Sequence, residues 1–335
     1  MKSVVYSQPG LPLQDPQSLY DADLPVPSPG ARDLLVEVKA IAVNPVDTKI
    51  RASRGGDQPQ VLGWDAVGIV REVGEQVTLF QPGDEVFYAG AIDRPGCYSE
   101  FHRVDERLVG RKPSSLDAAS AAALQLTSIT AWELLFDRLR LEENGGQGQH
   151  LLIIGAAGGV GSILVQLARQ LTGLTVIATA SRAQTQAWVK DLGAHLVIDH
   201  SAPLAAQLSA HGVAAVDHVI SLTHTDTYLE QLIEVLRPQG QLALIDDPAQ
   251  LDVVPLKRKS LSLHWELMFT RSLYQTHDMI KQHQLLNRIS EMVDTGVLKT
   301  TVGEHFGTIN ASNLKRAHAV IESGKARGKI VLEGF

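Results

Sequence analysis

The chain has 335 residues, 44% of them hydrophobic and 20% charged, which is the composition of a folded protein with packed cores. At roughly 150 residues per domain, this length predicts about two domains. The net charge of −7 disfavours a nucleic-acid binder or a protein held on anionic lipid. The single cysteine, Cys97, excludes an intrachain disulfide and a zinc site of several thiolates. It fits a reducing compartment, and the N-terminus turns polar too early for a signal peptide, so we expect a cytoplasmic protein.

The first third of the chain is typical of an antiparallel β domain. Residues 34–43, 66–73 and 84–88 are predicted strands, because they are short apolar or alternating runs bounded by glycine and proline. From about residue 116 the sequence becomes rich in alanine, and residues 117–139 are predicted to be helical. We therefore place a domain boundary near residue 125.

Strands and helices alternate in the middle of the chain, which predicts a parallel sheet with helices on both faces. Helical patterns lie between the first, second, fourth and fifth of five predicted strands, at residues 151–154, 175–178, 196–198, 217–221 and 241–245. A further strand, 261–269, is expected at the sheet edge because it follows the charged cluster Lys257-Arg258-Lys259. An uncovered apolar edge strand favours aggregation, so we expect this strand to pair two subunits into a homodimer. A helix at 275–295, a helix at 311–323 and a strand at 329–332 are predicted to follow.

The strongest local motif is a glycine-rich turn between a predicted strand and a predicted helix, with the sequence Gly155-Ala156-Ala157-Gly158-Gly159-Val160-Gly161. Gly158 would let the backbone approach a pyrophosphate, Gly161 would let the helix pack closely on the strand, and the helix N-terminus would face the negative charge. Ala156 stands where this fingerprint has its first glycine. A tight turn of another α/β protein is the alternative, and the surrounding strands favour a dinucleotide. A membrane span over residues 151–168, which carry no charge, is disfavoured by its four glycines.

The residues after the next strand indicate which nicotinamide cofactor fits. An Asp or Glu there would bind the ribose 2′-hydroxyl of NAD, but this chain has Thr179-Ala180-Ser181-Arg182. Ser181 and Arg182 can hold a 2′-phosphate through a hydroxyl and a guanidinium. We therefore predict NADP(H) rather than NAD(H). The alternative for Arg182 is an exposed residue at a helix start.

The order of a β domain, an alanine-rich helix and the glycine turn resembles the medium-chain dehydrogenase/reductase superfamily over nearly the whole chain. Five motifs support the resemblance, Val43-Asn44-Pro45-Val46-Asp47, Leu62-Gly63-Trp64-Asp65-Ala66-Val67-Gly68, Gly83-Asp84-Glu85-Val86, Gly96-Cys97-Tyr98-Ser99-Glu100-Phe101 and Leu126-Thr127-Ser128-Ile129-Thr130-Ala131-Trp132. It implies an α/β fold in which a GroES-like catalytic domain of residues 1–125 and 276–335 encloses a Rossmann domain of residues 126–275. The resemblance also implies an active site in the cleft between them.

Alcohol dehydrogenases of that superfamily hold a catalytic zinc through a Cys, a His and a second Cys or Asp. The positions here carry Asn44 and Trp64, with Leu126 near the third, and none of these side chains is a good zinc ligand. The four-cysteine lobe for a structural zinc is missing, and the 12 histidines lack paired ligand spacing. The resemblance is therefore to the zinc-free quinone oxidoreductases, although such relatives are often named zinc-type alcohol dehydrogenases. We expect no zinc.

Without a Lewis acid, simple alcohols and ketones are poor substrates. Quinones and α,β-unsaturated carbonyls are better, because hydride addition leaves the charge on a delocalised phenolate or enolate. The expected function is an NADPH-dependent reductase of such small molecules, with no nucleic acid or membrane as partner. A zinc-dependent alcohol dehydrogenase and a non-catalytic NADPH-binding protein are the alternatives.

The resemblance implies roles for several residues of the catalytic domain. Asn44 would donate its amide to the substrate oxygen or bridge two loops. Asp47 and Asp65 would tune the site or fix loop geometry. Trp64 would close the pocket over a planar ring or pack in the core, and Tyr98 would donate a proton or be a core tyrosine.

For the cofactor, the resemblance places Thr130 at the start of the crossover helix and His200 where an aromatic residue stacks on the adenosine. Lys329 is a candidate for a phosphate contact, with a surface lysine as the alternative. Residues after the carboxyl ends of parallel strands border the ligand crevice. The predicted cofactor set is Thr130, Ala156, Gly158, Gly159, Val160, Gly161, Ser181, Arg182, His200, Leu222 and Ile245.

Overall fold

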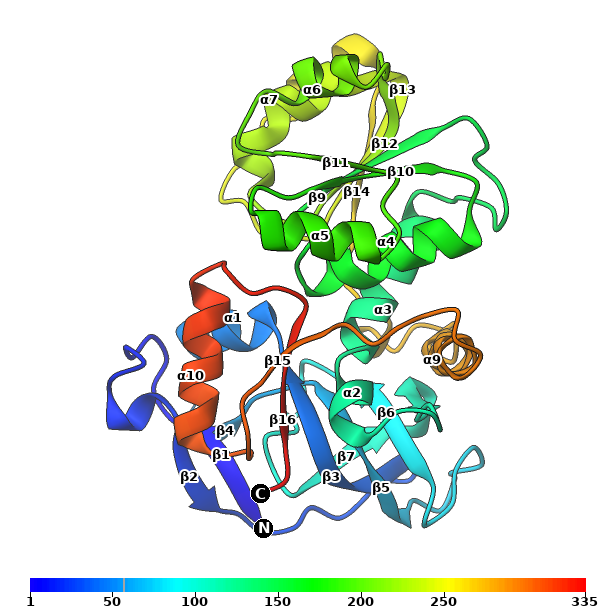
Figure 1. Ribbon diagram of the computed structural model, residues 1–335. Helices are drawn as coiled ribbons and strands as arrows, with labels where there is room; N and C mark the ends of the chain where they lie inside the picture. Colours follow the sequence, from blue (N-terminus) through cyan, green and yellow to red (C-terminus); the bar gives the residue numbers. More distant parts are fainter. Residues whose placement is uncertain (57) are drawn as a thin grey trace. The chain divides into compact units, whose positions relative to one another are not determined.

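The computed structural model describes residues 1–56 and 58–335. The chain forms two compact units, one of residues 1–129 with 269–335 and one of residues 130–268 (Figure 1). The junctions thus follow residues 129 and 268, whereas the sequence analysis placed them after residues 125 and 275.

The first unit is built on a seven-stranded sheet, in the order β15-β16-β3-β5-β6-β8 with β7 also paired to β3. These strands are β3 (Asp33–Val43), β5 (Asp65–Val73), β6 (Glu85–Ala89), β7 (Phe101–Asp105), β8 (Val109–Arg111), β15 (Val302–His305) and β16 (Lys329–Glu333). A smaller sheet contains β1 (Lys2–Tyr6), β2 (Tyr20–Asp23) and β4 (Gln60–Val61). The last strand, β16, lies antiparallel to β3 with Ile330 opposite Val43, so the C-terminal segment completes a sheet made mostly by the first third of the chain.

The α-helices in the described part of this unit are α1 (Pro45–Ser53), α2 (Ala118–Ala122), α8 (Thr270–Leu273), α9 (Lys281–Asp294) and α10 (Ala311–Glu322), and α3 (Gln125–Trp132) crosses the junction to the second unit. Single turns of 3₁₀-helix occur at Pro16–Ser18 and Glu106–Leu108. The prediction of one helix over 117–139 is wrong, because α2 and α3 are separate and a π-helix, Glu133–Arg138, follows. A contact from a distant part of the chain explains why the helix is divided. The Asp65 carboxylate accepts a hydrogen bond from the Leu126 backbone N–H (2.8 Å) and caps the first turn of α3. The helix predicted from residue 275 begins at Lys281, and Gln275 instead has φ 44°.

The second unit is a six-stranded parallel sheet in the order β11-β10-β9-β12-β13-β14. Its strands are β9 (His150–Ile154), β10 (Thr175–Thr179), β11 (Leu196–Ile198), β12 (Val216–Ser221), β13 (Leu236–Leu244) and β14 (Ser262–Trp265). Helices α4 (Gly159–Leu171) and α5 (Ala183–Asp191) cover one face, and α6 (Leu204–Ala210) and α7 (Thr225–Val235) cover the other (Figure 1). A 3₁₀ segment, Val254–Lys259, precedes β14. This is the predicted Rossmann-type doubly wound sheet, and its strand order reverses between β9 and β12.

The edge strand is shorter than the predicted range 261–269. Only Ser262–Trp265 is a strand, and the Glu266 amide makes one more bond, to the Leu244 carbonyl (3.0 Å). The chain then leaves the sheet to bury Met268 and Phe269, whereas Trp265 and Leu267 remain 50% and 51% exposed.

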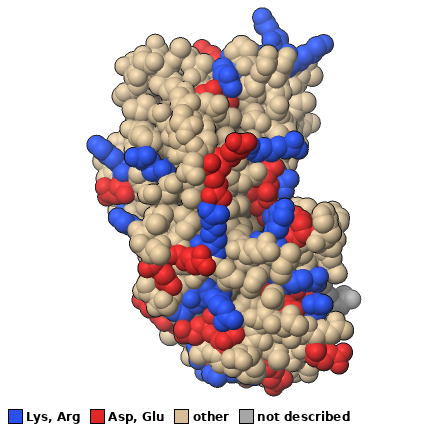
Figure 2. All heavy atoms as spheres, turned by 90° about the vertical axis from the view of Figure 1, so that its right-hand side faces the viewer, with Lys and Arg blue, Asp and Glu red and all other residues tan. Residues whose placement is uncertain are grey.

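Residues 151–168, weighed above as a membrane span, form β9 and part of α4. Across residues 1–56 and 58–335, no helix combines the length and the apolar character that crossing a membrane requires. Figure 2 shows acidic and basic side chains interspersed on the face that it displays.

Candidate functional site

The carboxyl ends of the parallel strands meet at one edge of the second unit. Ile154 at the end of β9 lies opposite Ser221 of β12, and Ser221 lies opposite Leu244 of β13. Thr179 of β10 likewise lies opposite Ile198 of β11. The predicted cofactor residues that directly follow these strands therefore share one edge, namely the glycine turn, Ser181, Arg182, His200, Leu222 and Ile245. Thr130 does not open its helix as expected, since α3 begins at Gln125 and Thr130 is 5% exposed within it.

The glycine turn is a tight connection between β9 and the N-terminus of α4. Gly155 has φ 78°, and the Gly158 amide donates to its carbonyl (3.1 Å) just before α4 begins at Gly159. A Cβ on Gly161 would lie 2.4 Å from the Ala156 carbonyl oxygen, so only glycine allows this approach of helix and strand. A Cβ on Gly158 would meet only the Gly155 oxygen, at 3.4 Å. The space beside Gly158 is therefore free for a ligand, where the first amides of α4 lack intrahelical acceptors.

Ser181 and Arg182 are both exposed and stand between β10 and α5. The Arg182 carbonyl accepts bonds from the Thr185 hydroxyl and the Gln186 amide (both 2.9 Å), which fixes its backbone at the start of α5. His200 is partly buried, and its ring is nearly perpendicular to that of Tyr228, at 6.2 Å. Ser181, Arg182 and His200 all follow the carboxyl ends of strands in the second unit, where the sequence analysis predicts the dinucleotide.

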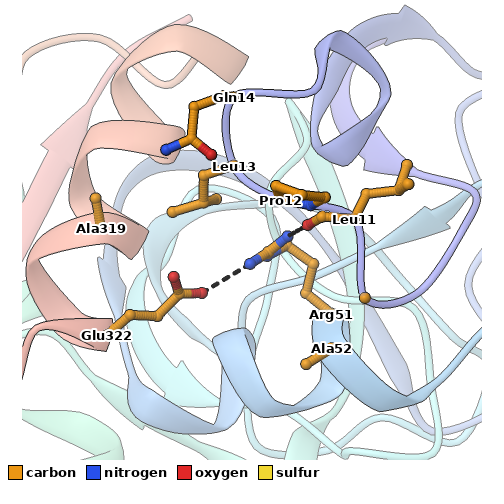
Figure 3. A pocket seen from close by; sticks show the side chains of 9 residues that line it. Leu11, Pro12, Leu13, Gln14, Arg51, Ala52, Ala319 and Glu322 are labelled. Carbon is orange, nitrogen blue, oxygen red and sulfur yellow. Dashed lines mark hydrogen bonds and ion pairs between the residues drawn. The ribbon is translucent and has the colours of Figure 1, made fainter.

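A hollow of about 400 Å³ lies in the first unit among residues 10–14, α1 and α10 (Figure 3). Arg51 crosses it and donates to the Leu11 carbonyl and to the Glu322 carboxylate (both 2.7 Å). The guanidinium therefore joins α1 to α10, and we assign this hollow a structural role.

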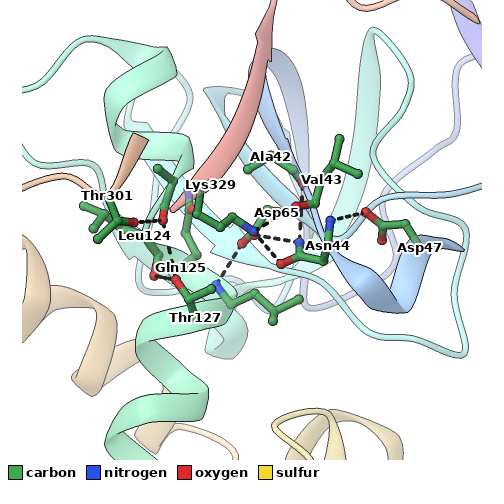
Figure 4. A network of polar contacts seen from close by, with 12 residues as sticks. Ala42, Val43, Asn44, Asp47, Asp65, Leu124, Gln125, Thr127, Thr301 and Lys329 are labelled. Carbon is green, nitrogen blue, oxygen red and sulfur yellow. Dashed lines mark hydrogen bonds and ion pairs between the residues drawn. The ribbon is translucent and has the colours of Figure 1, made fainter. Parts of the chain in front are cut away.

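A buried polar network surrounds Asn44, the residue before α1 (Figure 4). Its side-chain amide donates to Asp65 Oδ2 (2.8 Å) and more weakly to the Ala42 carbonyl (3.4 Å). The Lys329 ammonium donates to Asp65 Oδ2 (2.9 Å), to the Val43 carbonyl (3.2 Å) and to Asn44 Oδ1. Lys329 is 3% exposed, so the interpretation of a surface lysine is wrong, because the pairing of β16 with β3 carries this residue into the core.

Asp47 and Tyr98 form a second buried group beside the first. Asp47 Oδ2 accepts bonds from the Asn44 backbone N–H and from the Tyr98 hydroxyl, each 2.8 Å long. Burial raises the pKa of Asp47 to about 7 and raises that of Tyr98 well above its usual value. His318 Nε2 lies 3.5 Å from the same hydroxyl, and burial lowers the pKa of His318 to about 3. The sequence analysis did not single out His318, and its only signal was a place on the buried face of the helix predicted at 311–323.

Trp64 is 2% exposed in the core of the first unit. Its indole N–H donates to the Ala91 carbonyl (2.9 Å), and its ring meets Phe269 edge-on at 6.1 Å. These contacts are those of a packed core residue.

The residues at the positions of the family's zinc ligands do not fit a zinc ion. Asn44 Oδ1 is bound by the Lys329 ammonium, the Trp64 indole has no lone pair for a metal, and the Leu126 side chain is apolar. Burial raises the pKa of the nearby Cys97 thiol well above its usual value, which disfavours a thiolate ligand. Within the described part of the chain, no group of three or more His, Cys, Asp or Glu side chains could hold a metal.

Comparisons with known proteins cover both units. Residues 30–114 match the alcohol dehydrogenase GroES-like domain, and residues 192–332 match a zinc-binding dehydrogenase family. A "Zinc-type alcohol dehydrogenase-like protein" of Staphylococcus epidermidis is 38% identical over 96% of both chains. The "2-methylene-furan-3-one reductase" of Solanum lycopersicum is 28% identical over 93% of this chain and 74% of its own length.

Two solved structures show the same fold. A Rhizobium etli protein, provisionally named a zinc-dependent alcohol dehydrogenase, has a TM-score of 0.97 and 57% identity, over 100% of this chain and 98% of its own. The quinone oxidoreductase of Escherichia coli, in complex with NADPH, has a TM-score of 0.84 and 25% identity, over 99% of this chain and 100% of its own.

Proposed function

The chain belongs to the medium-chain dehydrogenase/reductase superfamily, among the zinc-type alcohol dehydrogenase-like proteins, and we propose that it is a metal-free, NADPH-dependent reductase of quinones or α,β-unsaturated carbonyls. The observation that carries the proposal is the glycine turn at the N-terminus of α4, on the same sheet edge as Ser181 and Arg182. The NADPH complex of the Escherichia coli quinone oxidoreductase supports this choice of cofactor.

In this proposal the residues of the second unit bind and orient the cofactor. The first amides of α4 and the open space beside Gly158 hold the pyrophosphate. The Ser181 hydroxyl and the Arg182 guanidinium hold the 2′-phosphate, and the absence of an acidic side chain from residues 179–182 removes a repulsive charge. Bound NADPH supplies the hydride, and the protein holds the acceptor against it.

The substrate class follows from what the first unit does not supply. The residues at the metal positions do not fit zinc. The side-chain amide of Asn44 already donates to Asp65, and the Tyr98 hydroxyl already donates to Asp47. An acceptor that delocalises its own negative charge needs neither a metal nor a dedicated side-chain acid. Quinones and activated enones are such acceptors. The names of the tomato reductase and of the bacterial quinone oxidoreductase support the same class.

The test is NADPH oxidation with 1,4-benzoquinone, 9,10-phenanthrenequinone and an enone, run in parallel with NADH and with EDTA. We expect turnover that resists EDTA and favours NADPH. Turnover that EDTA abolishes would favour the zinc-dependent alcohol dehydrogenase. Tight NADPH binding without turnover of any acceptor would contradict the proposed substrate class and favour the non-catalytic alternative.

We also propose a homodimer paired through β14. This strand ends the six-stranded sheet with β13 as its partner in the described part of the chain, and the exposed Trp265 and Leu267 lie at its end. Light scattering of the purified protein should give twice the chain mass, and a Trp265→Lys, Leu267→Lys variant should give a monomer. A wild-type monomer at high protein concentration would contradict the proposal.

A further inference from the structure

Three oxygen atoms converge on one point in the core of the first unit. They are the Val43 carbonyl at the end of β3, the Asn44 side-chain oxygen before α1 and Asp65 Oδ2 at the start of β5 (Figure 4). The Lys329 ammonium occupies that point, 3.2 Å from the first oxygen and 2.9 Å from the third. Backbone, amide and carboxylate oxygens are the ligand types that hard cations take in proteins.

The burial of this lysine is nearly complete. Lys329 is 3% exposed, Asn44 is 1% exposed and Asp65 is fully buried. A buried ammonium is stable only where a counter-charge and hydrogen bonds replace water, and Asp65 with the two neutral oxygens provides both. Asp65 in turn accepts bonds from the Leu126 amide and the Asn44 side chain, so all the groups of this cluster hold one another in place.

We infer that Lys329 is a built-in cation, which fills an oxygen-lined cation site in the first unit and takes the place of a bound metal. The ammonium excludes a metal ion by its charge and by its volume. Without the lysine, one carboxylate and two neutral oxygens would remain, which suit Mg²⁺, Ca²⁺ or Mn²⁺ better than zinc.

This inference goes beyond the proposed function and does not depend on the substrate. A protein without quinone turnover would contradict the proposed function and leave the inference intact.

The first test removes the lysine side chain. We expect wild-type protein to contain well under one metal ion per chain, and Lys329→Ala to bind about one Mg²⁺, Ca²⁺ or Mn²⁺. The melting temperature of that variant should rise by about 3 °C when the cation is at roughly ten times its dissociation constant. Metal analysis and thermal unfolding give both readouts.

A matched control is Lys259→Ala in the second unit. The Lys259 ammonium also donates to three oxygens, of Ile233, Glu234 and Leu236 (2.8, 2.7 and 2.7 Å), but all are backbone carbonyls without a carboxylate. We expect no cation binding by this variant. A stoichiometric metal in the wild-type protein, or no gain of cation binding in Lys329→Ala, would overturn the inference.

A second test does not require the alanine variant to fold. Lys329→Met should lower the melting temperature by on the order of 10 °C, because it leaves Asp65 as a buried charge without a counter-ion. Adding Asp65→Asn removes that charge, so the double variant should be more stable than Lys329→Met alone. Equal or lower stability of the double variant would show that Lys329 is not the counter-ion of Asp65, and would refute the proposed cation site.

Discussion

Replacing Asp47 with asparagine should make the protein more stable at alkaline pH. Burial is the main cause of the raised pKa of Asp47, which is about 7 in the folded protein against 3.8 as its ordinary value. The folded protein therefore retains a proton between about pH 4 and 7 that the unfolded chain has released. This contribution to stability is fully present below pH 4 and is lost as the pH rises through 7, at a cost of up to about 4 kcal/mol.

An asparagine at position 47 is neutral at every pH. Its single side-chain oxygen can accept the bonds from the Asn44 backbone N–H and the Tyr98 hydroxyl. Near pH 4 we expect Asp47→Asn to be no more stable than the wild type. At pH 8 it should be more stable by about 1 to 4 kcal/mol, the lower figure allowing for amide hydrogens that gain no acceptor.

Urea unfolding at several pH values between 4 and 8 measures the difference between the two proteins. Burial lowers the pKa of His102, a residue of β7, and that of His318 in both proteins, so the contributions of these two residues cancel in that difference. A difference that does not change with pH would refute the buried, raised pKa of Asp47.

Three further predictions concern the glycine turn, Arg182 and the buried His102. Gly161→Ala should lower the free energy of unfolding by about 2 kcal/mol or more, which urea unfolding measures. Gly158→Ala should fold normally yet bind NADPH about tenfold more weakly or worse, which fluorescence titration measures. Equal stability of the two variants would contradict the packing described for Gly161. Arg182→Ala should raise the dissociation constant of NADPH by about 10- to 100-fold and leave that of NADH unchanged, so an equal loss for both would argue against a 2′-phosphate contact. Burial lowers the pKa of His102 to about 4, so the free energy of unfolding of the wild type should fall by up to about 3 kcal/mol as the pH drops from 6.5 to 4. The free energy of unfolding of His102→Gln should lack this part of the decrease. An unchanged decrease in that variant would contradict a buried, neutral His102.

The order of the strands in the second unit was predictable from the chain itself, whereas helix α6 between β11 and β12 was not predicted. Buried parallel strands are short apolar runs, and each is followed by a local turn signal, so β9, β10, β11 and β12 occur within one residue of the predicted bounds. The glycine turn is also local, because Gly158 and Gly161 act within the loop that contains them.

The wrongly predicted bounds of a helix and a strand have a common cause, which is contacts between residues far apart in the chain. The helix predicted over 117–139 is divided because a carboxylate from β5, Asp65, caps α3. The edge strand predicted over 261–269 is cut short because Met268 and Phe269 leave the sheet and are buried. Propensity and periodicity describe neighbours along the chain, and these contacts join residues far apart in it.

The sequence by itself determined the family, the two kinds of sheet, the glycine turn and the poor zinc ligands, because each depends on residues that are adjacent in the chain. Only the tertiary structure decided the surroundings of the buried charges. Asn44, Asp65 and Lys329 are up to 285 positions apart and meet because β16 pairs with β3. The charge state of Asp47 likewise depends on desolvation and on partners from other elements, since a pKa is set by the space around a group rather than by its neighbours in sequence.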